Sequence, residues 1–433
     1  MKYQREINLK YDVDVFVAGG GPAGVAASVT ASRMGAKVFC AEKAQCFGGM
    51  ATLALVPAFM RFSDGENFLA GGIGREIFDK HYGKDADFTI KELPLDAEKL
   101  KVIYDEMMVE SGVDFAFDTE VLDVEVTDGN IEYVVIRSGE EICAARAKVY
   151  VDATGNGTLS VKAGAPFEMG DEKGYMMPAT LCTTWNGIDW SRALYDAGKD
   201  PDARMLPKAF EDGVFSVKDP KLSGMWPFDK DRGGGNIGHA FGVDGTNAES
   251  VTEGILDARK RMKEYQYYYN HYLPGYENAR LTSTANVLGI RESRRIIGED
   301  YLTADAYFEH AVFENEIGRY AYPIDMHLSR IGEKEKYEGI FEKDYEKGRS
   351  YGIPFGCLVP KNTVNLLTAG RCVSGDREII GSLRVMPGCF ITGMASGAAA
   401  AISAIEEKSV RDIDIKKLQK NLKDMGAYLP NAK

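Results

Sequence analysis

The strongest constraint on the fold is a run of glycines, Gly19-x-Gly21-x-x-Gly24, set between an apolar stretch and a small-residue stretch. Glycines at this spacing allow a tight turn and let a pyrophosphate approach the backbone closely. The N-terminus of the helix that follows points its positive dipole end at the phosphates. The glycines therefore predict a dinucleotide site built on a parallel sheet.

The residues around the glycines fit a β-α-β unit. Residues 12–18 predict a strand, residues 22–35 predict a helix that Gly35 ends, and residues 36–42 predict a second strand. Such a unit forms a right-handed crossover between parallel strands. Glu42, at the tip of the second strand, is placed to accept hydrogen bonds from the hydroxyls of an adenosine ribose.

The rest of the chain divides into two kinds of sequence. Residues 1–165 and 350–433 contain buried-strand and small-residue helix patterns, so we expect them to form one discontinuous nucleotide-binding domain. Residues 166–349 are richer in aromatic and charged side chains and include a tyrosine-rich run at 265–276, which we expect to be domain core. The predicted fold class is α/β, a Rossmann-like domain with a parallel sheet and a β-meander, carrying an inserted α+β substrate domain.

Several elements of the first domain can be predicted individually. Asp128-Gly129 is a typical hairpin turn between alternating strands over 113–137. The other expected elements are a helix at 95–112, strands at 147–152 and 364–369, and a small-residue helix at 388–406.

Charge and hydropathy exclude some classes of partner. The chain has 52 Lys and Arg against 65 Asp and Glu, a net charge of −13, whereas nucleic-acid-binding domains are basic. No apolar run approaches the length of a membrane span, and the N-terminus lacks a signal-peptide pattern. We expect a cytoplasmic protein of two or three domains with no nucleic-acid or membrane partner, which can form a homo-oligomer.

The cysteines point away from disulfides and metals. There are seven, an odd number, and none forms Cys-x-x-Cys. A disulfide framework, a zinc site and a protein-bound iron–sulfur cluster all require paired or clustered cysteines. We therefore expect isolated reduced thiols and no metal.

Three further segments resemble the two-dinucleotide-binding-domain flavoproteins. Gly48-Gly49-Met50-Ala51-Thr52 is similar to a second flavin fingerprint, in which a glycine pair opens a helix beside the cofactor. Residues 151–155 (VDATG) resemble the segment where the chain returns past the adenosine. Residues 369–376 (AGRCVSGD) resemble the C-terminal flavin segment, in which an Asp meets the ribityl chain. The resemblance implies FAD.

Longer segments narrow the resemblance to the broad bacterial FAD-dependent oxidoreductase family. They are residues 48–52 (GGMAT), 288–303, 322–327 (YPIDMH), 353–361 and 369–401. The similarity covers most of the chain, including the inserted middle. It implies an FAD enzyme with a substrate domain over the flavin, but no single reaction.

The resemblance and the glycine motif together give the predicted cofactor contacts. They are Gly19, Gly21, Pro22, Ala23, Gly24, Glu42, Lys43, Gly48, Gly49, Met50, Ala51, Thr52, Val121, Ala153, Thr154, Gly155, Gly370, Gly375, Asp376, Pro387, Gly388 and Cys389. The N-terminus of the helix at 388–406 would face the pyrimidine end of the flavin and stabilise its anionic form. We expect FAD to be non-covalent, although Cys46 offers a possible tether.

No second nicotinamide domain is evident. Gly233-Gly234-Gly235-Asn236 and Gly71-Gly72-Ile73-Gly74 are Gly-rich, but neither has the strand–helix context, so both are expected to be loops. Reduced flavin would then pass its electrons to a second small molecule, to oxygen or to a partner protein.

Two histidines are the candidate proton-transfer groups. Asp325 and His327 are two residues apart and would share one face of a strand, an arrangement in which an Asp orients a catalytic His. His239 follows the glycine-rich stretch at 233–236 on another expected strand. His81, His271 and His310 lie in helix-like or loop contexts.

Arginines are the candidate groups for binding an acidic or polar substrate. Arg291 would share a face with Arg294 or Arg295 if this stretch is helical. An ion-pair network with Glu292 and Glu299 is the alternative. Arg384, just before the predicted flavin-facing helix, is a further candidate.

The sequence thus predicts dehydrogenation of an alcohol-like carbon in a polar small molecule such as a sugar or glycoside, with His327 or His239 taking the hydroxyl proton. An external acceptor would reoxidise the flavin. One alternative is reduction of an activated C=C or C=O bond, with arginines holding a carboxylate. Another is an electron-transferring subunit of a larger complex.

Overall fold

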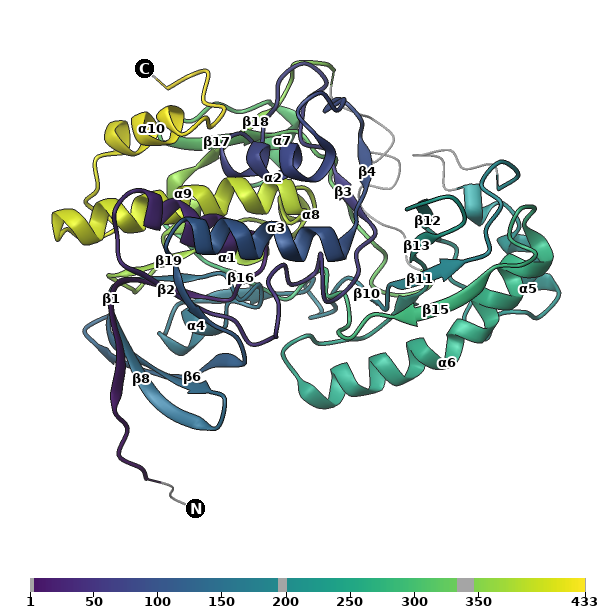
Figure 1. Cartoon of the computed structure of the whole chain (residues 1–433), viewed down its shortest axis with the longest axis horizontal. Coiled ribbons are helices and arrows are strands. Elements are labelled where there is room, and N and C mark those ends of the chain that lie inside the picture. Colours follow the sequence, from purple (N-terminus) through teal and green to yellow (C-terminus); the bar gives the residue numbers. More distant parts are fainter. Residues whose placement is uncertain (1–3, 194–200, 333–345, 433) are drawn as a thin grey trace.

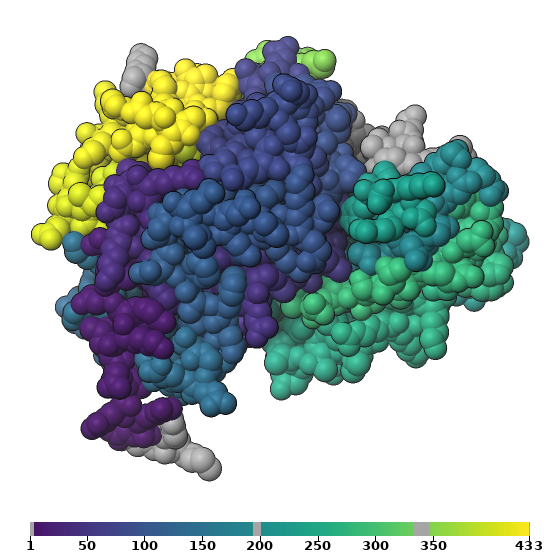
Figure 2. All heavy atoms as spheres, in the orientation of Figure 1, coloured from purple at the N-terminus to yellow at the C-terminus, as the bar shows by residue number. Residues whose placement is uncertain are grey.

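The computed structural model describes residues 4–193, 201–332 and 346–432. Figure 1 shows a larger lobe, which contains both termini, and a smaller lobe in teal and green on the right. The space-filling view in Figure 2 shows the smaller lobe standing beside the purple and blue part of the larger one.

The larger lobe is built on a sheet in the order β5-β2-β1-β8-β7-β6. Strands β5 (Asp114–Ala116), β2 (Val38–Ala41), β1 (Leu9–Ala18) and β8 (Glu141–Asp152) run parallel. β8 pairs along its first part with the antiparallel β7 (Asn130–Ser138), which pairs with β6 (Thr119–Thr127). The last part of β8 pairs with the parallel β19 (Leu366–Thr368). This arrangement confirms the predicted α/β class, with its parallel sheet and β-meander.

Side chains of β1 alternate between two hydrophobic layers. Val15 and Val17 pack in one cluster with helices α1 (Pro22–Arg33), α3 (Ala97–Glu110) and α9 (Met386–Glu406). Phe16 packs in another, with β6, β7 and α4 (Thr158–Lys162). The parallel strands of the sheet therefore lie between helices on one face and the meander on the other (Figure 1).

Helix α9 packs closely against α1 because it carries glycines at the contact. A Cβ added at Gly393 or Gly397 would lie 2.2 Å from the backbone oxygen of Ala23 or Ala27. By length and composition α9 could also cross a membrane, but 94% of its most apolar window is buried inside the protein. It is therefore a core helix of the larger lobe.

The smaller lobe is a four-stranded antiparallel sheet covered by a long helix. Its order is β12 (Gly224–Pro227), β13 (Gly233–Asn236), β11 (Thr183–Asn186) and β15 (Arg280–Thr284). Helix α6 (Ala248–Tyr272) packs Tyr265, Tyr268 and Tyr269 into its core. The aromatic run at 265–276 thus contributes to the core as predicted.

The remaining elements connect and cover these two sheets. They are β3 (Ala58–Met60), α2 (Ile73–Tyr82), β4 (Glu92–Pro94), β9 (Phe167–Met169), β10 (Ala179–Thr180), α5 (Leu206–Glu211), β14 (His239–Ala240), β16 (Arg294–Ile296), α7 (Ala304–Phe308), β17 (Glu316–Tyr320), β18 (Tyr351–Pro354), α8 (Arg377–Leu383) and α10 (Ile415–Asp424), with short 3-10 helices at Pro201–Ala203, Phe355–Leu358 and Gly370–Cys372.

Four local predictions need correction. Residues 233–236 form strand β13 rather than a loop, because Gly233 to Gly235 pair with β11 and β12 at positions where side chains would clash. Gly74 lies in helix α2, not in a loop. The stretch 49–53 makes consecutive turns instead of a helix. Residues 291–293 are irregular and residues 294–296 form β16, so the stretch is not helical and the helical face of arginines does not form.

The domain boundaries 166–349 stay a prediction. Within that range, residues such as Leu302, Tyr307, Tyr320 and Ile324 pack in the same hydrophobic cluster as β1 and α9. The core of the smaller lobe is formed by residues between Trp185 and Leu281.

Candidate active site

A cavity of about 1850 Å³ opens between the glycine-rich turn of the larger lobe and the smaller lobe. Ligand pockets for drug-sized molecules typically span about 300–1,000 Å³. The cavity therefore has room for a dinucleotide and a small molecule together. Its wall includes residues of β1 and α1 at one end and of β12 and β13 at the other.

The glycine-rich turn has the backbone geometry that a pyrophosphate site needs. Gly19 has φ +92°, and a Cβ at Gly24 would lie 1.8 Å from the Gly19 carbonyl oxygen, so neither position accepts a side chain. A Cβ at Gly21 would meet no atom within 4 Å. Gly21 therefore faces open space at the N-terminus of α1, where an anion is stabilised by the helix dipole.

Glu42, the predicted contact of the adenosine ribose, lies in the cavity wall. Its carboxylate accepts hydrogen bonds from the backbone N–H of Gly20 (2.6 Å) and of Ala44 (2.7 Å). Burial raises the pKa of Glu42, while these backbone N–H groups lower it less. Glu42 thus lies in the cavity wall, as the sequence predicts, and also fixes the glycine-rich turn.

The structure brings most of the predicted cofactor residues to one cavity. Those in its wall are Gly19, Gly21, Pro22, Ala23, Glu42, Lys43, Gly49, Met50, Val121, Ala153, Thr154, Gly155, Gly370 and Cys389. Those outside the wall are Gly24, Gly48, Ala51, Thr52, Gly375, Asp376, Pro387 and Gly388. Several of the second group support the turn, since Thr52 donates to the Phe47 carbonyl and Gly48 N–H to the Gly20 carbonyl.

Asp376 lies outside the cavity wall and has a structural role, and its predicted ribityl contact stays a prediction. One carboxylate oxygen accepts the N–H of Ile379 (2.7 Å) and caps α8, and the other accepts the N–H of Ala304 (2.8 Å). Both oxygens are thereby committed to backbone groups away from the cavity.

Arg371 was not among the predicted contacts, although it lies in the segment 369–376 that resembles a flavin segment. Arg371 lines the cavity and donates to Asn156 Oδ1 (2.7 Å), and its buried Nε has no hydrogen-bond partner in the described residues. Burial lowers the pKa of its guanidinium. Arg371 thus offers a positive charge and an unused N–H donor at the cavity. Such a group fits the anionic pyrophosphate of FAD or the hydroxyls of its ribityl chain.

The N-terminus of α9 reaches the cavity through Val385, Met386 and Cys389. The Cys389 thiol donates to the Arg384 carbonyl oxygen (3.2 Å), and burial raises its pKa to about 12. Cys46 lies outside the cavity wall, half-buried and 3.8 Å from Thr52 Oγ1. The seven cysteines are all unpaired in the described part of the chain.

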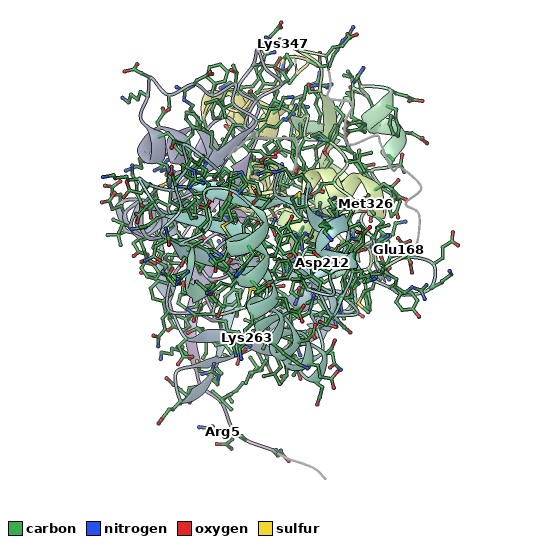
Figure 3. All side chains as sticks on the ribbon, turned by 90° about the vertical axis from the view of Figure 1, so that its right-hand side faces the viewer. Arg5, Glu168, Asp212, Lys263, Met326 and Lys347 are labelled. Atoms are coloured by element: carbon green, nitrogen blue, oxygen red, sulfur yellow. The ribbon has the colours of Figure 1, made fainter. Side chains whose placement is uncertain are left out.

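At the substrate end, four of the predicted catalytic residues and one unpredicted carboxylate form a continuous line. His239 Nδ1 lies 2.9 Å from Asp219 Oδ2, and His239 Nε2 lies 2.9 Å from His327 Nδ1. His327 Nε2 lies 3.0 Å from Asp325 Oδ1, and Asp325 Oδ2 accepts from Arg384 Nη2 at 3.0 Å. Met326, labelled in Figure 3, marks the segment between Asp325 and His327.

The line runs from the interior to the cavity. His327, Asp325 and Arg384 are part of the cavity wall, whereas His239 and Asp219 lie behind them. All five side chains are largely buried, and Asp325 is the most exposed of the four acid and imidazole groups at 14%. The segment around His327 is irregular rather than a strand, so its pairing with Asp325 is correct but the predicted strand is wrong.

In this line, burial and the neighbouring charges shift the pKa of each carboxylate and imidazole in opposite directions. Burial raises the pKa of Asp325, but His327, Arg384 and Lys221 outweigh it and hold that pKa well below its ordinary value. Burial also opposes ionisation of Asp219, and His239 overcomes it to lower the pKa. For His327 and His239, burial lowers the pKa, and their carboxylate neighbours oppose this only in part.

Arg291 lies beside this line, fixed by neutral acceptors. It donates to the Pro178 carbonyl (2.9 Å), Thr180 Oγ1 (2.6 Å) and Asn236 Oδ1 (3.0 Å). No acidic side chain among the described residues forms an ion pair with it. Burial and then the charge of Arg384 lower its pKa to about 10.

The other two predicted arginines are structural. Arg295 pairs with the buried Glu292 (2.9 Å), and Arg294 stacks over the Phe167 ring. Glu299 pairs with Arg411 instead of this cluster. The alternative ion-pair reading therefore holds for Arg295 and Glu292.

Comparison with known proteins places the chain among flavoproteins. A model of the family described as "FAD dependent oxidoreductase" matches residues 14–422. A solved geranylgeranyl bacteriochlorophyll reductase-like protein from Thermoplasma acidophilum is 15% identical, with a TM-score of 0.51, and the match covers 96% of this chain and 84% of that one. At this identity the likeness shows the fold alone.

Two other solved flavoproteins are similar at lower scores. The p-nitrophenol 4-monooxygenase of Pseudomonas putida is 12% identical, with a TM-score of 0.44 and coverage of 96% of this chain and 85% of that one. The myxobacterial halogenase CndH is 12% identical, with a TM-score of 0.46 and coverage of 95% and 78%. None of the curated protein sequences matches this chain.

Proposed function

The chain belongs to the FAD dependent oxidoreductase family, and on that premise we propose that it dehydrogenates an alcohol-like carbon of a polar small molecule. The observation that carries the proposal is the Asp325–His327 pair in the wall of the cavity (3.0 Å). A general base must take the hydroxyl proton as the hydride leaves carbon. This pair lines the cavity and can accept that proton.

FAD supplies the acceptor for the hydride when it is bound. The protein's own groups then act on the proton and on charge. Both ring nitrogens of His327 face protein partners, one towards Asp325 and one towards His239, so the proton enters where His327 Nε2 meets Asp325. Arg384 neutralises Asp325 and keeps its carboxylate ionised.

Arg291 supports a substrate that carries an acidic group. Its guanidinium is held in place by neutral acceptors and borders the same cavity. A buried cation without a counter-charge is costly, and a carboxylate or similar anion would relieve that cost. Neither the family nor the solved structures narrow the substrate to a sugar or glycoside.

The same arginine favours one alternative, reduction of an activated C=C or C=O bond next to a carboxylate. In that direction the protonated histidine line would supply the proton. The third possibility, an electron-transferring subunit of a larger complex, has no specific support from the cavity.

The experiment is anaerobic mixing of the purified yellow protein with panels of hydroxy acids, sugar acids, sugars and polyols, followed by flavin absorbance. Bleaching by one hydroxyl-bearing class supports the dehydrogenase and names the class. Pre-reduced protein that is reoxidised anaerobically by enoates, with no bleaching by any donor, would establish the reductase instead.

We further propose that an external acceptor reoxidises the flavin and that the protein acts in the cytoplasm. Gel filtration of the native protein would reveal a homo-oligomer or a stable partner.

A further inference from the structure

The line from Asp219 to Asp325 contains three contacts, and each of them needs one proton. A carboxylate oxygen facing an imidazole nitrogen at 2.9 or 3.0 Å is favourable when a hydrogen lies between them. The same holds for the two imidazole nitrogens of His239 and His327, which are 2.9 Å apart. The buried Asp219 Oδ2 makes no other close polar contact among the described residues, and the 2.9 Å approach of His239 Nδ1 is an ion-pair contact whose orientation falls short of a hydrogen bond.

Counting protons links these contacts together. A neutral imidazole carries a single N–H, so two neutral histidines supply one proton fewer than the three contacts require. With both carboxylates ionised, one contact must then bring two lone pairs together. A further proton fills the vacant contact, and the vacancy can move along the line as the tautomers change.

We propose that Asp219, His239, His327 and Asp325 act as a single acid/base group that gains and loses one shared proton, and that this proton enters and leaves at Asp325 and His327. His239 and Asp219, which do not reach the cavity, are positioning residues of this group. The consequence for catalysis rests on the proposed function, but the shared titration does not.

The surroundings of the group favour release of the shared proton. Lys221 Nζ lies 3.9 Å from Asp325 Oδ1, and Arg261 donates to the His239 carbonyl oxygen (2.7 Å). Cations disfavour an added positive charge, so they oppose uptake of the third proton. The charged and titratable side chains that face the group from neighbouring elements are Lys221, Arg261, Tyr265, Arg291, Tyr322 and Arg384.

The proton balance of the reaction follows from these two states. With the contact nearest the cavity vacant, His327 Nε2 presents a lone pair. In the proposed dehydrogenation, the substrate O–H proton would pass to this nitrogen and the C=O bond would form, while bound FAD would accept the C–H electron pair as hydride. The group then holds three protons, and all its contacts are filled.

The test is a pH titration of the FAD-loaded protein labelled with ¹⁵N only in histidine, followed by NMR. Five histidines give few signals. We expect the His239 and His327 nitrogens to shift with one common midpoint that no other histidine signal shares. Separate midpoints for His239 and His327, or no change in either, would refute the shared proton whatever the enzyme activity.

A variant removes the innermost charge without removing bulk. Asp219→Asn takes away a carboxylate that favours the protonated group, so the common midpoint moves to lower pH by about one unit or more. The matched control is Glu253→Gln, which removes an exposed carboxylate of helix α6 and leaves the midpoint in place. FAD content and thermal unfolding verify that each variant is folded.

The kinetic readout separates positioning from binding. In Asp219→Asn the pH profile of donor-driven flavin reduction moves with the NMR midpoint, while the donor concentration for half-maximal rate changes little. An unmoved NMR midpoint contradicts the proposal. A moved midpoint in a protein that no donor reduces supports the shared proton and contradicts the dehydrogenase.

Discussion

Arg384 Nη2 lies 3.0 Å from Asp325 Oδ2, and the same nitrogen donates to the Asp325 backbone oxygen. Arg384 caps the C-terminus of α8, and α9 begins two residues later at Met386. This pair therefore links the start of α9 to Asp325. Under the proposed function, Arg384 would therefore contact both the start of α9 and the residues that carry the proton.

Loss of this pair should slow catalysis. Arg384→Gln removes a charged hydrogen bond worth about 1.5–3 kcal/mol, so donor-driven flavin reduction should fall about 10- to 100-fold, with Arg384→Lys in between. Stopped-flow absorbance measures the rate. Arg146→Gln, which breaks an exposed pair with Asp12, is the control and should leave the rate unchanged. An Arg384→Gln protein as fast as the wild type would contradict the assigned role.

Flavin reduction by the donor should depend on pH in one direction. Burial lowers the pKa of His327 and of His239, so the base form prevails at neutral pH and is lost as the pH falls through those lowered values. The reduction rate should therefore be flat near neutrality and decline in acid. A rate that instead rises in acid would favour the reductase direction.

Glu42 should govern FAD affinity. Glu42→Gln replaces one backbone-accepting oxygen by an NH₂ group, which cannot accept from Gly20 or Ala44. A lost hydrogen bond of about 1–2 kcal/mol would raise the dissociation constant of FAD roughly 5- to 30-fold. Fluorescence titration of the deflavinated protein measures it. Since protonation of Glu42 has the same effect and burial raises its pKa, wild-type affinity should also weaken in acid.

The α1–α9 contact should tolerate no added methyl group. Gly397→Ala places a Cβ 2.2 Å from the Ala27 oxygen, and overpacking of this kind costs about 1–3 kcal/mol of unfolding free energy. Urea denaturation measures the change. Ile405→Ala, at an exposed position of the same helix, should have a much smaller effect. A more stable Gly397→Ala protein would mean that helix propensity outweighs the clash.

The flavin should be released on denaturation. Cys46 lies outside the cavity wall, so unfolded protein should lose all of its yellow colour on filtration, and Cys46→Ser should retain full FAD content. Colour that remains with the denatured wild-type chain but not with the variant would establish a tether.

Local patterns were enough to predict the cofactor half of the molecule. The glycine spacing, the flanking apolar runs and Asp128-Gly129 each determine their own neighbourhood, and the strands and helices follow within a few residues. Arg371 belongs to a segment that already pointed to flavin, but its orphaned Nε depends on how Gly155 and Asn156 fold over it.

The substrate half could not be predicted in the same way. Asp219 belongs to no motif, and its meeting with His239 depends on pairing of β10 with β14. His239 and His327 are 88 residues apart, and only packing brings their rings together. Asp376 has a structural role that the motif did not indicate, because it caps α8, while its predicted contact with the ribityl chain stays a prediction.

The contact between His239 and His327 joins two different parts of the molecule. His239 belongs to β14, which pairs within the part of the chain that carries the smaller lobe, while Ile324 and Met326 anchor the His327 segment in the core of the larger one. The proposed acid/base group thus takes His239 and His327 from two different parts of the molecule. Proton transfer through this group would then require the two parts to stay packed together. A substitution that weakens their packing would lower activity even if it contacted neither flavin nor substrate.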